Sequence, residues 1–153
     1  MMVNYWLCIT DQENWHVIKS ELVWGVSGRY KAIMEQVKLG DLLVFYVKPK
    51  RICGIFIVSS EPYTSTKRIF KSGGISGQEI FPHRVKLKPL IVLDECLDFE
   101  SLISRLNFIR KKDRWTAYLR RAMVPLSEYD FKLIEGALKM KQKRREEEPI
   151  NYQ

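Results

Sequence analysis

A tryptophan followed by a glycine is the pair of residues in this chain whose types best suit the binding of a planar ring. Trp24 offers a flat indole face, and stacking on it costs little side-chain entropy. Gly25 has no side chain, so a flat ligand could approach its backbone closely. The alternative is that Trp24 is an ordinary core aromatic at the end of a strand or helix, because large apolar rings are often buried for packing alone.

Two short elements before this pair and one after it would have to position it. Residues 3–9 are rich in aromatic and β-branched side chains, which predicts a strand. The run Thr10-Asp11-Gln12-Glu13 has the spacing of a capping box, which predicts a short helix that ends near Lys19. Apolar residues recur at helical spacing from Gly28 to Lys38, which predicts a second helix.

Basic residues accompany the next predicted strands. Residues 42–47 and 52–59 predict two antiparallel strands joined by the turn Lys48-Pro49-Lys50-Arg51. Residues 84–88 alternate with period two, so a strand there would place Arg84, Lys86 and Lys88 on one face. The expected phosphate-binding set is therefore Lys48, Lys50, Arg51, Arg84, Lys86 and Lys88. The alternative for the alternating strand is the solvated face of an exposed sheet.

The remaining segments predict a loop, a strand and three helices. Residues 64–82 are polar and glycine-rich, and they are long enough to form a functional loop or lid. Residues 90–93 predict a short strand between Pro89 and Asp94, and Asp98, Asp113 and Ser127 each precede a run of helical spacing. The last helix is expected to end at Met140, with Phe131, Ile134 and Leu138 inward.

A second basic region surrounds two aromatic residues in the same part of the chain. Its cations are Arg110, Lys111, Lys112, Arg114, Arg120 and Arg121. Interleaved basic and aromatic residues are typical of nucleic-acid surfaces. Trp115 and Tyr118 are three residues apart on a predicted helix, however, so core packing is expected for at least one of them.

Composition and element order define the class of protein. With 153 residues, of which 46% are hydrophobic, the chain can bury one core, so we expect one domain at 1–140 and a charged, disordered tail at 141–153. The order of elements predicts an α+β protein with a mixed, mostly antiparallel sheet curled into a small barrel. The formal net charge of +8 favours anionic partners such as nucleic acid.

The sequence also bounds the chemistry and the location of the protein. Cys8, Cys53 and Cys96 are widely spaced without a Cys-x-x-Cys pair, so they are expected to be reduced core residues without a disulfide or a bound metal. No cofactor is expected. No apolar run has the length of a membrane helix and no signal peptide is visible, which predicts a cytoplasmic protein without a membrane partner.

Five stretches, in order, resemble the EVE domain of the PUA-like superfamily. They are Tyr5-Trp6-Leu7, Trp24-Gly25-Val26, Lys38-Leu39-Gly40-Asp41-Leu42-Leu43-Val44-Phe45-Tyr46, Gly54-Ile55 and Phe81-Pro82-His83-Arg84-Val85. The superfamily includes PUA domains, which bind RNA, and YTH domains, which bind N6-methyladenosine in RNA. The resemblance implies a curled, barrel-like sheet flanked by helices, with a pocket suited to a nucleobase that is often modified.

The resemblance also implies roles for particular residues. In the YTH relatives a tryptophan forms one wall of an aromatic cage, and Trp24 matches its position. A polar side chain ten residues earlier contacts the base edge there, which corresponds to Asn14, and the carbonyl of Gly25 could accept a base N–H. A second cage aromatic is expected at Phe81 or Tyr63, with Tyr46 as a weaker candidate. The expected base-binding set is Asn14, Trp24, Gly25, Ser27, Tyr63 and Phe81.

These observations predict a module that accommodates a nucleobase from single-stranded RNA or from flipped-out DNA. The alternatives are a protein-interaction module that uses the charged residues 141–148, or a domain that binds a small ligand. A small hydrolase is the least favoured reading, because no Ser, His and Asp form a nucleophile-elbow pattern. Residues 72–77 also lack the lysine of a phosphate-binding loop, so no enzymatic activity is expected.

Overall fold

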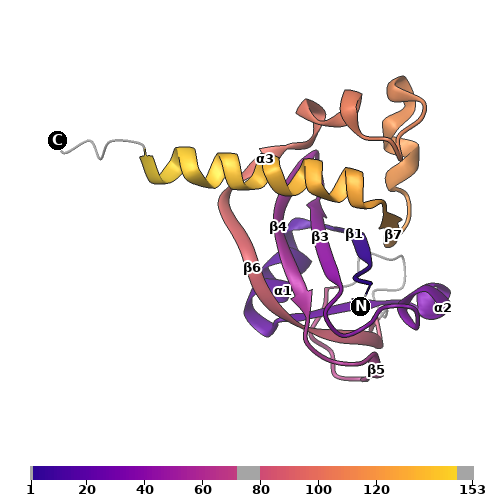
Figure 1. Ribbon diagram of the computed structural model, residues 1–153. Coiled ribbons are helices and arrows are strands. Elements are labelled where there is room, and N and C mark those ends of the chain that lie inside the picture. Colours follow the sequence, from indigo (N-terminus) through magenta and orange to yellow (C-terminus); the bar gives the residue numbers. More distant parts are fainter. Residues whose placement is uncertain (1, 72–79, 148–153) are drawn as a thin grey trace.

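The computed structural model describes residues 2–71 and 80–147, and a strongly curled sheet forms its centre (Figure 1). The strands are β1 (Tyr5–Thr10), β2 (Val23–Val26), β3 (Leu42–Val47), β4 (Arg51–Val58), β5 (Tyr63–Thr64), β6 (His83–Asp98) and β7 (Met123–Leu126). Their order is β2-β6-β4-β3-β1-β7, and β5 pairs with β6. Only the β1–β3 pairing is parallel among those described. The predicted α+β class with a mixed, mostly antiparallel, curled sheet is confirmed.

The longest strand, β6, gives the sheet its curl. It pairs with β2 near its beginning and with β4 along the rest of its length, so the two halves of the sheet share it. Two separate strands were predicted here, at 84–88 and 90–93, because proline usually ends a strand. The prediction of a break is wrong, since Pro89 lies where the register between β4 and β6 shifts, and a bulge tolerates a residue without an N–H.

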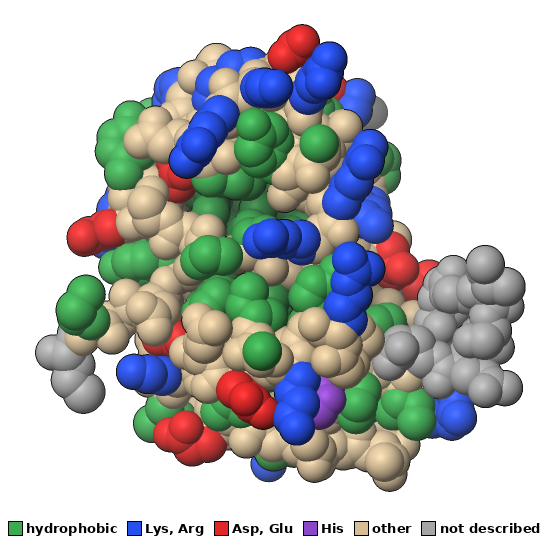
Figure 2. Space-filling model, turned by 90° about the vertical axis from the view of Figure 1, so that its right-hand side faces the viewer, with side chains coloured by type: hydrophobic (Ala, Val, Ile, Leu, Met, Phe, Trp, Pro, Cys, Tyr) green, Lys and Arg blue, Asp and Glu red, His purple; other side chains and the backbone are tan. Residues whose placement is uncertain are grey.

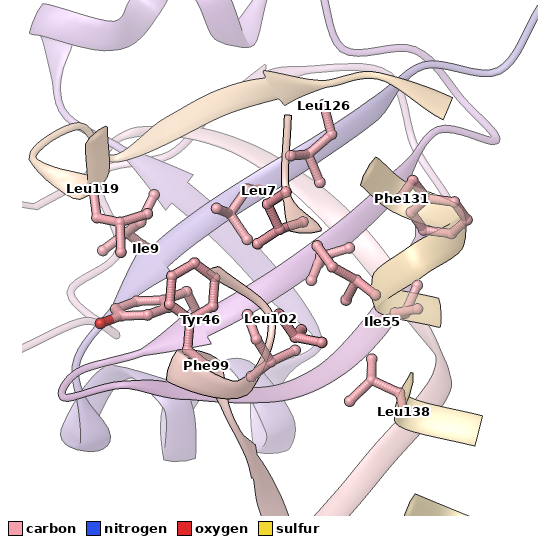
Figure 3. Close-up of a cluster of buried hydrophobic side chains, with 14 of the residues drawn as sticks. Leu7, Ile9, Tyr46, Ile55, Phe99, Leu102, Leu119, Leu126, Phe131 and Leu138 are labelled. Atoms are coloured by element: carbon pink, nitrogen blue, oxygen red, sulfur yellow. The ribbon is translucent and has the colours of Figure 1, made fainter. Parts of the chain in front are cut away.

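Helices cover the two sides of the curled sheet and close two hydrophobic clusters. The helices are α1 (Gln12–Glu21), α2 (Lys31–Met34) and α3 (Glu128–Glu147). Figure 3 shows the cluster beneath α3, where Phe131 and Leu138 point toward side chains such as Leu7 and Ile55 of the sheet. The predicted inward face of α3 is thereby confirmed. The second cluster lies inside the curl and contains Trp15 of α1 and Trp24 of β2.

The N-terminal helix begins as predicted, but with a different cap. The carboxylate of Asp11 accepts the main-chain N–H of Asn14 at 2.9 Å, whereas Thr10 is the last residue of β1. The helix predicted over residues 28–38 is much shorter. Gly28–Tyr30 form a 3₁₀-helix and α2 ends at Met34, after which single turns lead to Asp41.

Asp41 explains why this segment stops being helical. Its buried carboxylate accepts the main-chain N–H groups of Asn4 and Lys38 and the indole N–H of Trp6, at 2.9–3.0 Å. A carboxylate with three such donors fixes the chain on both sides of it. The Lys38–Tyr46 stretch that resembles the EVE family therefore has a structural function at Asp41.

The segment between β6 and β7 is less regular than predicted. Three 3₁₀-helices, Phe99–Ser101, Ile103–Arg105 and Lys112–Leu119, replace the two expected α-helices, although Asp98 does cap the first of them. Trp115 and Tyr118 both pack against the cluster beneath α3, as expected for at least one of them. The run at 141–147, predicted to be disordered, instead continues α3, and Lys141 and Arg145 lie 4.0 and 3.9 Å from the carboxylate of Glu95 of β6.

The cysteines differ from the prediction of reduced thiols. Cys53 of β4 and Cys96 of β6 form a disulfide, with their Cα atoms 4.6 Å apart, and only Cys8 is a free, buried thiol. Sequence spacing could not reveal the bond, because the two residues are 43 positions apart and meet only through the β4–β6 pairing. Among the described residues, no helix is both long and apolar enough to cross a membrane.

Candidate functional site

A small pocket opens where β1 ends, α1 begins and β2 passes alongside. Its volume is about 170 Å³. It is lined by Ile9, Thr10, Asp11, Asn14, Trp24, Gly25, Lys48, Phe70, Phe81 and Ala122. Four of the six residues predicted to bind a base are therefore brought together here, with two phenylalanines and one tryptophan around the same space.

Trp24 forms a wall that is fixed by packing from behind. Its side chain is only 4% exposed, and the edge of its ring meets Phe45 at a centroid distance of 5.5 Å. The indole Nε1 is buried and has no hydrogen-bond partner among the described residues. Buried donors without partners are exceptions in folded proteins and are often found at functional sites. Trp24 thus belongs both to the core and to the lining of the pocket, and its binding of a planar ring stays a prediction.

Gly25 allows two phenylalanines to approach the backbone of β2. A Cβ atom at this position would lie 2.8 Å from Cε2 of Phe70 and 2.8 Å from the carbonyl oxygen of Phe81. The two phenylalanine rings meet edge to face at a centroid distance of 5.9 Å. Gly25 therefore leaves the room that Phe70, another residue of the pocket lining, occupies beside β2, and not only room for the approach of a ligand.

We expect Gly25→Ala to disturb the pocket more than its small volume change suggests. The added methyl group would force Phe70 outward, since the carbonyl of Phe81 is part of the backbone, and overpacking of this kind costs about 1–3 kcal/mol. Urea unfolding would measure the loss. Gly28→Ala is a matched control, because no heavy atom lies within 4 Å of the Cβ position there, and an equal loss in both variants would contradict this account.

Asn14 lines the pocket, but its amide group is already engaged. Its Nδ2 donates to the main-chain carbonyl of Lys71 at 2.8 Å, and the main-chain N–H of Lys71 donates to its Oδ1 at 2.7 Å. The side chain is 8% exposed. Asn14 therefore links α1 to the segment that carries Phe70, a contact between residues 57 positions apart.

The period-two alternation predicted that Arg84 would share one face of the strand with Lys86 and Lys88. The structure shows instead that Arg84 is buried. It is 2% exposed, and its guanidinium donates to the main-chain carbonyls of Lys67, Ile80 and Phe81. Its Cζ also lies 5.3 Å from the centre of the Phe70 ring. Burial lowers the pKa of Arg84 from its usual value. The predicted exposure of Arg84 is wrong because β5 and the residues after it cover this end of β6.

The cations of the β3–β4 turn differ in their surroundings. Lys48 is exposed and lines the pocket, so its charge is available at the rim. Lys50 instead forms an ion pair with Glu100 at 2.6 Å, and this hydrogen bond raises the pKa of Lys50. Arg51 donates to the main-chain carbonyl of Lys48 at 2.8 Å. Among the six predicted phosphate-binding residues, the structure places only Lys48 at the pocket.

The other predicted site residues lie elsewhere. Ser27 precedes the 3₁₀-helix after β2, Tyr63 pairs with Arg84 in the sheet, and Tyr46 accepts the main-chain N–H of Lys50. None of the three lines the pocket. Sequence reasoning missed Phe70 as a wall, and its signal was an aromatic residue within the otherwise polar loop at 64–82. Residues 72–79 of that predicted loop or lid lie outside the described residues.

The two histidines of the chain lie away from the pocket. His16 is exposed and its ring nitrogen pairs with the side chain of Gln12 at 3.1 Å, while His83 lies at the start of β6. Neither lines the pocket. In the part of the chain that the structure describes, no three His, Cys, Asp or Glu side chains gather in a way that could hold a metal ion.

One face of the molecule carries many basic side chains. Figure 2 shows Lys and Arg side chains gathered at the upper end of this face, above a hollow with hydrophobic side chains. In Figure 1 the same end is formed by the 3₁₀ segments between β6 and β7. The basic region predicted around Trp115 and Tyr118 thus keeps its cations outside while its aromatic rings pack inward.

The curled mixed sheet with its flanking helices and small aromatic pocket defines a PUA-like α+β domain. The family model described as the EVE domain matches residues 4–137, and the chain belongs to the EVE domain family. It is 43% identical to UPF0310 proteins of Pyrococcus abyssi and Pyrococcus horikoshii. The two alignments each cover 89% of this chain, and they cover 100% and 99% of those proteins.

Solved structures with low sequence identity share the fold. A hypothetical protein from Leishmania major has a TM-score of 0.64 at 19% identity, with 92% of this chain and 98% of that chain covered. The YTH domain-containing protein Mmi1, solved as a complex with RNA, has a TM-score of 0.69 at 10% identity, with 95% and 87% covered. These similarities establish the common architecture of the sheet and its helices.

Proposed function

We propose that this protein binds single-stranded RNA or DNA and holds one nucleobase in the pocket that Trp24, Phe70 and Phe81 line. The observation that carries the proposal is the aromatic pocket itself, with three ring-bearing residues around about 170 Å³ and the exposed cation Lys48 at its rim. A base stacked on an aromatic side chain gains about 1–3 kcal/mol. A neighbouring lysine supplies the charge that a backbone phosphate requires.

The size of the pocket suits a single ring system. Sites for drug-sized ligands usually measure about 300–1,000 Å³. A space of about 170 Å³ is smaller, so it suits a base whose sugar and phosphate remain outside. A base in a duplex would have to leave the stack to enter, whereas a single-stranded base is already available.

Asp11 offers a means of choosing among bases. One oxygen of its exposed carboxylate caps α1, and the group also lines the pocket. A carboxylate accepts hydrogen bonds from the exocyclic amino group of a base. We therefore favour a base with an exocyclic amino group, namely adenine, cytosine or guanine, over uracil or thymine, and a methylated amino group would still keep one N–H for Asp11.

The comparisons support this proposal at the level of the fold. The chain belongs to the EVE family, and the YTH domain of Mmi1, which shares the fold, was solved with RNA. The formal net charge of +8 agrees with an anionic partner. Binding is proposed rather than catalysis, since among the described residues neither histidine reaches the pocket and no serine or cysteine lines it.

Nine-nucleotide RNA and DNA oligonucleotides that differ only at the central position would test the proposal. The central residue would be adenine, N6-methyladenine, cytosine, 5-methylcytosine, 5-hydroxymethylcytosine or an abasic sugar, and fluorescence anisotropy would give each Kd. The proposal predicts that at least one base binds about tenfold or more tightly than the abasic strand, because stacking is lost without a base. Equal Kd values for every strand, or no binding at all, would refute it.

Lys48→Ala should weaken binding of all these strands to a similar extent. A phosphate contact carries no base information, and its loss should reduce the slope of log K against log salt by about 0.7 for a single strand. Lys50→Ala is the matched control, since Lys50 lies in the same turn but is paired with Glu100. An unchanged slope in the Lys48 variant would show that this cation does not contact the strand.

A second candidate function is protein binding, and an apolar stripe on the outer side of α3 favours it. Tyr129, Leu133, Gly136 and Met140 are spaced four, three and four residues apart, and Tyr129 and Met140 are more than half exposed. Such spacing is typical of a helix that packs against another helix. Arg105 and Lys132 border the groove, so its occupant would be an amphipathic helix with acidic flanks.

A synthetic helical peptide would test this second candidate. Its leucines would repeat at the same spacing and glutamates would occupy its other positions. Specific binding should be abolished by Met140→Glu, which places a charge in the groove. Binding that the substitution leaves unchanged, or no binding by the parent protein, would remove this candidate.

A further inference from the structure

We infer that Asn14 and Arg84 are positioning residues that hold Phe70 in place as the second wall of the pocket. The consequence of this positioning for nucleobase binding rests on the proposed function. The positioning of Phe70 itself can be tested without a ligand. The inference gives Asn14 a role different from the direct contact with a base that the family resemblance implies.

The hydrogen bonds of Asn14 are the first step of the argument. Its amide oxygen and nitrogen pair with the two main-chain groups of Lys71, at 2.7 and 2.8 Å. A carboxamide uses the same donor and acceptor to bind the N6 and N7 atoms of adenine. The backbone of Lys71 therefore takes the place that a base edge would need, and Asn14 cannot make both contacts at once with a base while this pair remains.

Arg84 holds the same segment at other points. It donates to the carbonyl of Lys67, three residues before Phe70, and to the carbonyls of Ile80 and Phe81 at 3.0 Å each. No described carboxylate pairs with it, so the buried charge is stabilised by three carbonyl dipoles and by the face of the Phe70 ring. An arginine can span these acceptors, whereas a lysine has one compact charge.

Phe70 is consequently enclosed by fixed groups. The backbone of Gly25 lies on one side, the guanidinium of Arg84 lies over the ring, and the edge of Phe81 completes the contact. Phe81 itself has a φ of 53°, a conformation that is uncommon for a residue with a side chain. Its carbonyl is held in this conformation by Arg84 at 3.0 Å.

A pocket built in this way is ready for a ring before the ligand arrives. The entropy of ordering the phenylalanine wall has already been lost on folding, so binding does not have to supply it. The position of Phe70 would then limit which groups can enter the space that it lines together with Trp24. Asn14 and Arg84 thus influence which base is bound by fixing the position of Phe70, without contacting the base themselves.

Asn14→Asp and Arg84→Lys are the informative variants. Asn14→Asp keeps the shape but turns the donor toward Lys71 into a carboxylate oxygen, and Arg84→Lys keeps the charge but not the span. We expect hydrogen exchange, followed by mass spectrometry, to become about tenfold faster over residues 67–71 in both variants. The ratio of Kd values between the abasic strand and the best-bound base should fall toward one.

Asp41→Asn is the matched control for a general loss of stability. Asp41 is a buried side chain that also holds main-chain N–H groups, but it does not line the pocket. We expect a lower midpoint of urea unfolding in this variant, with unchanged exchange at 67–71 under native conditions and an unchanged Kd ratio. A purely structural role of Asn14 and Arg84 would make all three variants alike, which would overturn the inference.

Two other outcomes would also overturn it. Weaker binding by Asn14→Asp with unchanged exchange would mean that Asn14 contacts the base directly. Faster exchange with an unchanged Kd ratio would mean that the position of Phe70 does not matter for selection. If the parent protein binds none of the strands, the proposed function fails, and the exchange rates alone decide whether Asn14 and Arg84 hold the segment.

Discussion

Trp24→Leu is expected to weaken binding of the best-bound oligonucleotide by about 5–150-fold, the equivalent of about 1–3 kcal/mol of lost stacking. Leucine still fills part of the core beside Phe45, so the protein should remain folded at a lower stability. Fluorescence anisotropy with the oligonucleotide set would give the change in Kd. The abasic strand should bind the variant and the parent equally, because it places no ring against Trp24.

Trp15→Leu is a closely matched control for this substitution. Trp15 is 2% exposed, belongs to the same hydrophobic cluster and meets Phe45 at 5.6 Å, nearly the distance of Trp24. It does not line the pocket. Truncation of a buried tryptophan to alanine costs about 3–5 kcal/mol of stability. Leucine removes fewer atoms, so both leucine variants should lose less than this amount, and by a similar extent. An equal loss of affinity in both would show that the effect comes from the core and not from a pocket wall.

Reduction of the Cys53–Cys96 disulfide is expected to lower the free energy of unfolding by about 4 kcal/mol, from the loss of chain-entropy restriction over a 43-residue separation. Urea unfolding of the protein with and without a reductant would measure the difference, and mass spectrometry would confirm the redox state. The bond joins neighbouring strands inside the sheet, so its loss acts mainly on the unfolded chain.

Cys8→Ala serves as the control in that experiment. Cys8 is a buried free thiol whose pKa is raised by burial, so it is a poor thiolate in the folded protein. The variant should show the same dependence on reductant as the parent. A variant with alanine at both Cys53 and Cys96 should lose that dependence completely. Equal stability of the oxidised and reduced parent protein would contradict the predicted effect.

Local patterns were sufficient to predict most of the sheet. The strands β1, β3 and β4 follow from dense β-branched and aromatic residues, and α3 follows from the helical spacing of its inward side chains. The failures have tertiary causes. The helix expected at residues 28–38 is shortened by turns that Asp41 stabilises from outside it, and β6 continues through Pro89 at a register shift.

The candidate site was predictable only in part, for a similar reason. The Trp24-Gly25 pair, Asn14 and Phe81 came from residue type and from resemblance to a family. Phe70 and the burial of Arg84 depend on how residues 65–71 fold back onto β2 and α1, and no local period encodes that contact. Tertiary contacts also decide which cations are engaged, since Arg84 is bound by the carbonyl of Lys67 and Lys50 is paired with Glu100, although both looked equivalent to Lys48 in the sequence.

The most direct test of the nucleobase pocket is the NMR spectrum of the ¹⁵N-labelled protein during titration with its best-bound oligonucleotide. The indole N–H of Trp24 and the main-chain N–H of Gly25 should shift, while the indole N–H groups of Trp6 and Trp15, which lie outside the pocket, should remain in place. The abasic strand should leave Trp24 unchanged. Binding that shifts only residues of α3 or of the basic face in Figure 2 would contradict the account.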